Sequence, residues 1–341
     1  MEVKSRLTFI DNAKAIGIVL VIFAHLKGVP EFLTAFIYSF HMPLFFFLSG
    51  YLLSDYKLNL KIKDYIDIQI KSLVVPYFFF GFFSILLFLI ESKVKHKSLH
   101  VTDNLLGLLY GVGQGLEFNV VLWFFTCLFS VMVVYYVIAK FFTKTTTLIL
   151  SCIIGLLVAY ESTYLPFRLP WNFELAFVAL VFFAMGNYLA STHIMSVMTV
   201  NKKACWVMVC VSLLLCIYFS FQNGRVDMNG MVFNSVPLYF LSGVAGVSFI
   251  IFLSSLLPVN KIAVLLSKNT IVIFPMHLLL FSTFSAVGIL VFHCENGFQN
   301  SIAFAIAYTV LVLVFSMPIA FLIRRYYPFL IGGVKVKGND A

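Results

Sequence analysis

Long apolar segments separated by short polar stretches recur along the whole chain, and they constrain its fold more than any other feature. They are long enough for an α-helix, at 1.5 Å per residue, to cross about 30 Å of hydrocarbon. Of the 341 residues, 62% are hydrophobic and only 11% are charged, with a mean hydropathy of +1.02. A water-soluble domain of this length needs far more polar surface. The sequence therefore predicts an all-α, polytopic membrane protein.

The pattern predicts about ten transmembrane helices, of which the fifth and sixth are short. The expected spans are 9–26, 32–53, 72–90, 120–139, 147–160, 175–190, 205–220, 236–257, 270–292 and 303–323. We expect a single membrane domain over residues 1–341, without a fused soluble domain. The six cysteines form no CxxC pair and mostly lie in or beside apolar segments, so no metal site is expected.

The basic residues predict the orientation of these spans. The net charge is +9, but no run of five or more basic residues occurs, so nucleic-acid binding is not indicated. With the amino terminus in the cytoplasm, all but six of the 23 Lys and Arg residues fall on the cytoplasmic side. The six are Lys27, Lys93, Lys95, Lys97, Arg168 and Arg225. Because Lys and Arg prefer cytoplasmic loops, both termini are expected in the cytoplasm.

The first span places three ionisable side chains in an apolar helix, "DNAKAIGIVLVIFAHLKG" at residues 11–28. Lys14 and His25 lie about 20° apart around the helix and about 16 Å apart along it. Asp11 falls on nearly the same face and is placed to pair with Lys14. Such groups are costly in hydrocarbon unless they face a cavity or a partner. Lys14 fits a snorkelling lysine and Asp11 a helix-start residue equally well, whereas His25 is the stronger functional candidate.

The second span carries another interior histidine in "FIYSFHMPLFFFLSGYLLS", residues 36–54. His41 lies mid-span, where it is expected to face the protein interior. Pro43 follows it and frees backbone groups for an internal site. Ser49 and Gly50 are typical of close helix packing.

The strings "DNAKAIGIVLVIFAH" and "FHMPLFFFLSGYL" resemble the acyltransferase 3 family of integral membrane acyltransferases, in particular its fucose 4-O-acetylase-like branch. That family has an arginine and a histidine in its first helix with ten residues between them, positions held here by Lys14 and His25. Lysine keeps the charge but lacks the bidentate fork of arginine. Three later strings fit the family pattern in order, "LWFF" with Trp123, "LPWNFELAFVALVFFAMGNYL" with Glu174, and "SKNTIVIFPMHLLL" with Phe274 and His277. The resemblance covers about residues 6 to 325.

The resemblance implies transfer of an acetyl group from acetyl-CoA to a saccharide hydroxyl. Expected acceptors are O-antigen, capsule or exopolysaccharide, or their lipid-linked precursors, in a bacterial cytoplasmic (inner) membrane. We expect His25 and His41 to be catalytic, and Lys14 with Asp11 to hold acetyl-CoA, which acts as a cosubstrate with no metal. Trp123, Glu174 and His277 are second-tier candidates for substrate binding. His25 suits a general base, and an acyl-histidine intermediate stays open.

Two other functions fit the composition. Interior histidines and a mid-span proline also suit a proton-coupled small-molecule transporter. A non-catalytic membrane scaffold is the third possibility, although it leaves the ionisable positions unexplained. The missing internal repeat and the family strings favour the acyltransferase. Its expected partners are acetyl-CoA, the saccharide acceptor and the lipid bilayer, with no nucleic acid and no predicted oligomeric state.

Overall fold

The computed structural model describes residues 8–94, 101–162, 167–192, 201–258, 260–290 and 300–332. Apart from one isolated β-bridge between Asp227 and Val232, the regular elements in these residues are helices, which confirms the all-α fold. In chain order the α-helices are α1 (Thr8–Ala24), α2 (Glu31–Tyr38), α3 (His41–Tyr51), α4 (Asp55–Leu58), α5 (Ile62–Gln69), α6 (Val75–Val94), α7 (Val101–Tyr110), α8 (Trp123–Phe141), α9 (Lys144–Glu161), α10 (Phe173–Ser191), α12 (Lys202–Asn223), α13 (Val236–Leu256), α14 (Lys261–Leu290) and α15 (Ile302–Tyr326).

The expected spans correspond to these helices. Over the described residues, nine helical segments are long and apolar enough to cross a membrane, and they match the second to the tenth expected span. The first expected span is α1, whose 17 residues measure about 25 Å and stand at the lower limit for crossing. α9 and α10 are longer than expected, and α14 begins well before residue 270. The protein is therefore a polytopic membrane protein.

Two of the spans are irregular. The second is broken between α2 and α3, where Phe40 leaves the helical conformation with φ −138° and ψ −14°. Pro43 lies in the first turn of α3, where its missing N–H costs no intrahelical bond. The third span is a continuous helix in which a π-helical turn, η1 (Ile70–Val74), joins α5 to α6. The break in the second span places His41 at the first position of α3.

One end of the bundle brings the start of α1 together with the end of α3, the end of α13 and the first part of α14. The Asn12 amide donates to the carbonyl oxygen of Leu257 at 3.1 Å, and Ser267 Oγ donates to Asp11 at 2.6 Å. The Phe9 and Tyr51 rings meet edge to face with centroids 5.6 Å apart. We call this end the Lys14 face, and its assignment to the cytoplasm stays a prediction.

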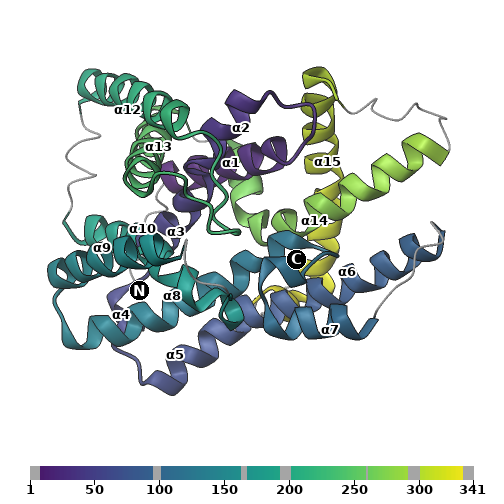
Figure 1. Cartoon of the computed structure of the whole chain (residues 1–341), viewed down its shortest axis with the longest axis horizontal. Coiled ribbons are helices and arrows are strands. Elements are labelled where there is room, and N and C mark those ends of the chain that lie inside the picture. Colours follow the sequence, from purple (N-terminus) through teal and green to yellow (C-terminus); the bar gives the residue numbers. More distant parts are fainter. Residues whose placement is uncertain are drawn as a thin grey trace, which may run out of the picture.

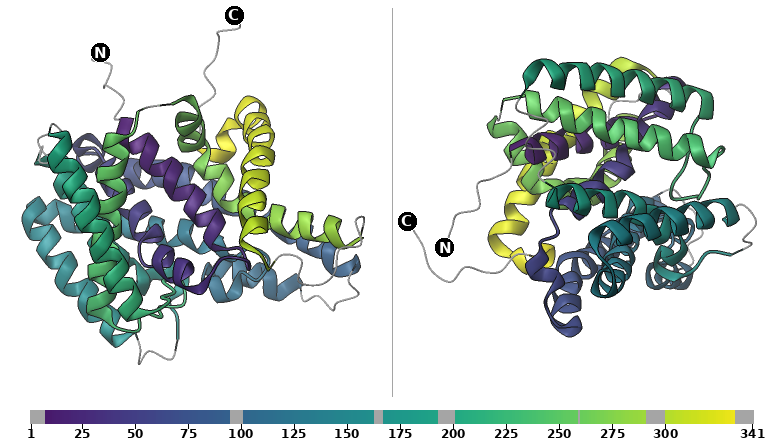
Figure 2. Two further views of the ribbon diagram at one scale, coloured as in Figure 1. Left: turned by 90° about the horizontal axis from the view of Figure 1, so that it is seen from above. Right: turned by 90° about the vertical axis from the view of Figure 1, so that its left-hand side faces the viewer.

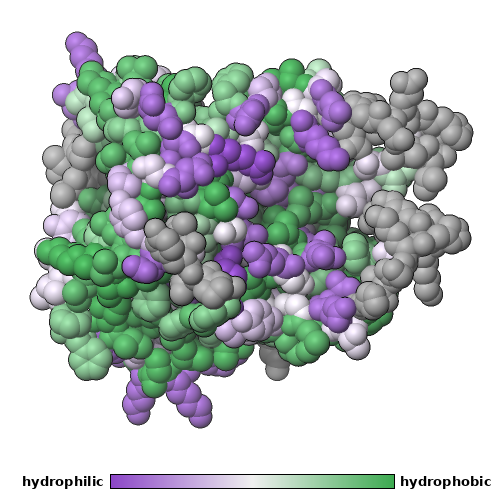
Figure 3. Space-filling model, in the orientation of Figure 1, coloured by the Kyte–Doolittle hydropathy of each residue, from purple (hydrophilic) through white to green (hydrophobic). Residues whose placement is uncertain are grey.

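The opposite end, the His25 face, gathers the link after α1 and the loop between α12 and α13. Gly28 packs so tightly on Ser301 that a Cβ atom would overlap the Ser301 carbonyl. The α12–α13 loop crosses the middle of the molecule near α1 and α2 in Figure 1. Figure 3, in the same orientation, shows hydrophilic side chains gathered across the middle of the surface and hydrophobic ones along its left edge.

The α1–α3 segment occupies the centre of the bundle. α1 packs against α14, α13, α3 and α15, and α3 packs against α10 and α13. Figure 1 and the left view of Figure 2 show α1 between the α12–α13 pair and the α14–α15 pair. Side chains that leave α1 or α3 toward the interior are thereby brought close to one another and to α14.

The contact between α3 and α10 depends on two glycines. A Cβ atom on Gly50 would overlap the carbonyl oxygen of Phe183, and one on Gly186 would overlap the carbonyl oxygen of Phe47. The Asn187 amide also donates to the carbonyl oxygen of Gly50 at 3.1 Å. The prediction of close packing is confirmed at Gly50, where α3 and α10 touch through their backbones, whereas the Ser49 hydroxyl bonds Phe45 O of its own helix.

Candidate functional site

Three histidines from three helices meet in the interior. His25 follows the last residue of α1, His41 begins α3, and His277 lies in α14. The ring centroids of His25 and His277 are 5.0 Å apart, and those of His25 and His41 are 6.4 Å apart, both in edge-to-face geometry. His41 and His277 are buried, with 3% and 0% exposure, whereas His25 is half-buried. His25 is therefore the central and most accessible member of this histidine cluster.

Each of the three rings is held by a backbone carbonyl at its Nδ1 atom. A carbonyl oxygen only accepts hydrogen bonds, so Nδ1 carries the proton and donates. The Nε2 atom of each neutral ring then keeps its lone pair, which is the state that a general base requires. The bonds join Nδ1 of His25 to Val21 O (2.7 Å), Nδ1 of His41 to Ile37 O (2.9 Å) and Nδ1 of His277 to Phe274 O (2.5 Å).

The three carbonyls lie in different backbone environments. α1 stops at Ala24 and the His25 N–H bonds Ile22 O, so Val21 O has no helical N–H partner and accepts from the imidazole. At the break between α2 and α3, Ile37 O accepts from the Phe40 N–H at 3.2 Å and from the His41 ring as well. In α14, Pro275 lacks an N–H, so Ile271 O loses its helical donor, while Phe274 O accepts from the His277 ring one turn later in the same helix. The main chain thus sets the tautomer of all three rings.

His277 presents a buried acceptor to the cluster. Its Nε2 atom is fully buried and has no hydrogen-bond partner among the described residues. Buried polar atoms are nearly always bonded, so an unpaired one marks a place for a water or a ligand group. The rings of Phe274 and Phe281 flank the imidazole, with centroids 5.9 and 5.8 Å away. Among the described residues, no group of three or more His, Cys, Asp or Glu side chains is arranged to hold a metal ion.

Lys14 and Asp11 lie at the other end of α1. Lys14 is half-buried, and Asp11 is 6% exposed and accepts the Ser267 hydroxyl hydrogen bond. The helix face between Lys14 and His25 carries Ile18 and Val21, both fully buried. The polar stripe on α1 therefore has two polar ends and an apolar middle.

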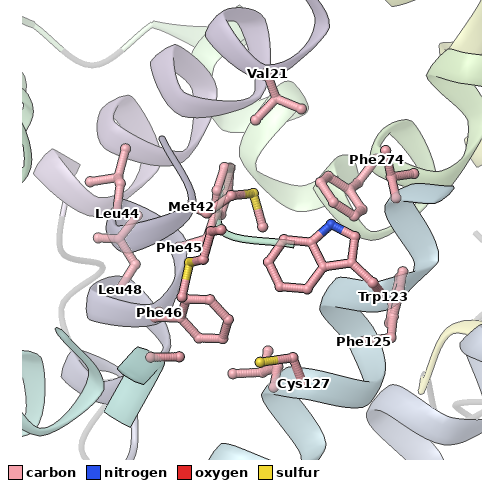
Figure 4. Close-up of a cluster of buried hydrophobic side chains, with 14 of the residues drawn as sticks. Val21, Met42, Leu44, Phe45, Phe46, Leu48, Trp123, Phe125, Cys127 and Phe274 are labelled. Carbon is pink, nitrogen blue, oxygen red and sulfur yellow. The ribbon is translucent and has the colours of Figure 1, made fainter. Parts of the chain in front are cut away.

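Trp123 packs in this apolar middle at the start of α8. Figure 4 shows its indole among Met42, Phe45 and Phe274, with the ring nitrogen on the side toward Phe274, and Val21 above. Trp123 is 6% exposed, and no described residue accepts a hydrogen bond from its N–H group. Its position links the apolar segment of α1 to the helices that carry His41 and His277.

Glu174 lies in a different environment. Arg168 Nε donates to one carboxylate oxygen, and the Leu169 N–H donates to the other at 3.0 Å. A second guanidinium nitrogen of Arg168 donates to Asn229 O at 2.7 Å, which ties the start of α10 to the α12–α13 loop. The contacts found for Glu174 in the described residues join it to this network and not to the histidine cluster.

Loss of Arg168 is expected to destabilise the fold. The Arg168 and Glu174 side chains are 13% and 5% exposed, so Arg168→Met strands a buried carboxylate, at a cost of about 3–5 kcal/mol. The thermal midpoint of the solubilised protein measures this loss. Lys144→Met is the control, because its partner Asp55 is 68% exposed and such surface pairs contribute about 0–1 kcal/mol. Equal shifts in both variants would contradict the structural role of Arg168.

Sequence reasoning missed three residues next to the cluster. The Tyr38 ring lies 4.9 Å from the His41 ring and 5.8 Å from the His25 ring, between centroids. The Arg225 guanidinium carbon stands 4.6 Å from the centre of the Tyr38 ring, and Asp227 interacts electrostatically with both His25 and Tyr38. The available signal was the polar, turn-rich string "QNGRVDMNG" between two apolar helices.

The fold and the site define a multi-pass membrane protein with a buried, base-bearing centre. A family model described as an acyltransferase domain matches residues 7–321. The chain therefore belongs to the acyltransferase 3 family and is a membrane acyltransferase. Comparison with curated proteins and with solved structures gave no match. Family membership decides for the enzyme and against the transporter and the scaffold.

Proposed function

We propose that this acyltransferase is an O-acetyltransferase that moves acetyl from acetyl-CoA to a hydroxyl of a cell-surface polysaccharide or of its lipid-linked precursor. The acceptor class and the location in a bacterial inner membrane follow from the resemblance to the fucose 4-O-acetylase-like branch. The observation that carries the chemistry is His25, half-buried between His41 and His277, with its Nδ1 proton bonded to Val21 O.

His25 acts as the general base in this reaction. Its Nε2 takes the proton of the acceptor hydroxyl while the hydroxyl oxygen attacks the thioester carbonyl carbon. The C–S bond breaks, and the leaving thiolate takes the proton back from His25, which gives the O-acetyl ester and free CoA. The Val21 carbonyl keeps Nδ1 oriented and stabilises the imidazolium that forms in between.

The donor enters from the Lys14 face. The phosphates of acetyl-CoA carry charges that hydrocarbon excludes, so they stay at the membrane boundary beside Lys14. The pantetheine arm then follows the apolar face of Ile18 and Val21 toward His25, about 16 Å away. The N–H group of Trp123, for which no described residue is an acceptor, supplies a hydrogen-bond donor along this path. Asp11, bonded to Ser267, orients the entrance.

His41 and His277 hold the reacting groups around His25. Both rings meet the His25 ring edge to face, so they restrict its orientation. The buried and unpaired Nε2 of His277 is placed to accept a proton or a hydroxyl hydrogen bond during transfer. Glu174 supports the site at a distance through Arg168 and the α12–α13 loop.

Comparison of the surface polysaccharide with and without the gene tests the proposed function. Mass spectrometry and NMR of the purified polymer are expected to show an O-acetyl ester that disappears on deletion and returns with the wild-type gene. An unchanged ester content in the deletion strain would refute the proposal.

Charge reversal at Lys14 is expected to act on donor binding. Lys14→Glu should raise the apparent KM for acetyl-CoA by tenfold or more with a smaller change in kcat, because it repels the phosphates. Lys14→Arg should keep a KM close to wild type. Steady-state kinetics in membranes measures both, with Lys27→Glu on the exposed link after α1 as the control. Equal KM values for Lys14→Glu and wild type would detach Lys14 from the donor.

A further inference from the structure

The α12–α13 loop, residues 224–235, places charged side chains beside the histidine cluster from the His25 face. Arg225 is exposed and lies over the ring of Tyr38 at 4.6 Å, while Tyr38 in turn touches the rings of both His25 and His41. Asp227 lies two residues further in the same loop, where it is half-buried and its backbone pairs with Val232. An unbroken series of side-chain contacts therefore leads from an exposed cation to the proposed base.

The α12–α13 loop is held in one conformation by buried side chains and hydrogen bonds. Val226 and Phe233 are 0% and 4% exposed and belong to the hydrophobic core. Asp227 and Val232 exchange two backbone hydrogen bonds of 2.8 and 2.9 Å, which close the loop into a narrow turn. Arg168, which pairs with Glu174 of α10, donates to Asn229 O at the tip of the loop. Buried side chains on both arms and this hydrogen bond at the tip keep Arg225 and Asp227 in place.

We propose that Tyr38, Arg225 and Asp227 form the acceptor subsite, and that it binds a neutral sugar through a pair of neighbouring hydroxyl groups. The proposal rests on the proposed function and assigns the acceptor to the face opposite the donor. The two substrates then reach His25 from opposite ends of α1.

The chemistry of the three side chains fits this ligand. The guanidinium fork donates to sugar oxygens, a carboxylate accepts from a hydroxyl, and the Tyr38 hydroxyl does either. Arg225 and Asp227 carry opposite charges. The attraction of an anionic sugar to Arg225 is therefore offset by its repulsion from Asp227. A neutral diol satisfies both groups at once. The hydroxyl beside the bound pair then faces His25 Nε2, which takes its proton as the ester forms and passes it to the CoA thiolate.

Competition in native membranes tests the subsite. Transfer of radiolabelled acetyl from acetyl-CoA to the endogenous polymer is measured with methyl glycosides of neutral hexoses and 6-deoxyhexoses as competitors, and with methyl glycosides of hexuronic acids of matched configuration. We expect at least one neutral glycoside to inhibit the wild type and its hexuronide to inhibit tenfold less. In Arg225→Ala and in Asp227→Asn, transfer should fall and that glycoside should inhibit tenfold more weakly. Arg325→Ala, an exposed arginine of α15, is the matched control.

Each outcome decides the proposal. Failure of all neutral glycosides to compete, equal competition by hexuronides, or unchanged inhibition in both loop variants overturns it. Stabilisation by CoA, measured as a shift of the thermal midpoint, shows that a variant is folded and still binds donor. Arg225→Lys, which keeps the charge, serves if the alanine variant does not fold. Absence of label incorporation by the wild type refutes the proposed function itself, and wild-type incorporation in His25→Ala removes His25 from the mechanism.

Discussion

Replacement of His25 by alanine is expected to reduce acyl transfer by about 10²–10⁴-fold, the usual contribution of a positioned general base. The substitution removes the only half-buried ring of the histidine cluster and leaves the buried His41 and His277 without their shared neighbour. The fold should persist, because His25 lies beyond the last residue of α1 and bonds only a backbone carbonyl that water can satisfy. Release of CoA and formation of the ester in membranes measure the loss.

Two comparisons sharpen this result. Lys27→Ala changes an exposed residue on the same link and should leave transfer near the wild-type rate. His41→Ala and His277→Ala should each reduce kcat, because both rings orient His25. Wild-type rates in His25→Ala would remove His25 from the mechanism. Accumulation of an acetylated protein that depends on His25 would replace the general-base mechanism with an acyl-histidine intermediate.

Introduction of a single methyl group at Gly50 or Gly186 is expected to prevent correct folding. In both cases the new Cβ atom would overlap a backbone carbonyl oxygen of the opposite helix, Phe183 for Gly50 and Phe47 for Gly186, and backbone cannot move aside as a side chain can. α3 and α10 would have to separate. Overpacking of a rigid core usually costs about 1–3 kcal/mol, and a clash between two backbones exceeds that range. The yield of monodisperse protein in detergent should collapse in Gly50→Ala and in Gly186→Ala.

Ser49→Ala is the matched control for this prediction. Ser49 precedes Gly50 in the same helix, is half-buried, and bonds only Phe45 O of its own helix. Its substitution should leave the yield and the thermal midpoint almost unchanged. Normal yields of Gly50→Ala and Gly186→Ala would show that α3 and α10 are further apart than described here.

The fold was largely predictable because one physical rule governs it. Hydrocarbon requires every backbone group to be bonded within the protein, so each long apolar segment had to be a helix. The ends of the helices were harder to place. α14 extends toward the Lys14 face through Lys261 and Lys268, whose charges end a hydropathy window although the helix continues. The break between α2 and α3 had a signal in Pro43, but its position at Phe40 depends on tertiary packing.

The candidate site was predictable where a polar residue stood out in an apolar helix. His25 and His41 were named on that ground and His277 from the family resemblance, and the three meet in one cluster. Lys14 and His25 were predicted to share one helix face, and Ile18 and Val21 between them are fully buried and apolar. Glu174 was named from the same resemblance, yet it pairs with Arg168. The contact between Tyr38 and Arg225 could not be predicted, because it forms only when the α12–α13 loop folds over the end of α2.

The three imidazole rings share one kind of anchor, a main-chain carbonyl three or four residues earlier in the chain. Because each anchor is a backbone atom, substitution of the surrounding side chains does not remove it. The side chains around the histidine cluster can therefore change to fit a new acceptor, while the three Nε2 atoms keep their positions. A change in the proton-accepting groups themselves requires a shift of the backbone that carries these carbonyls.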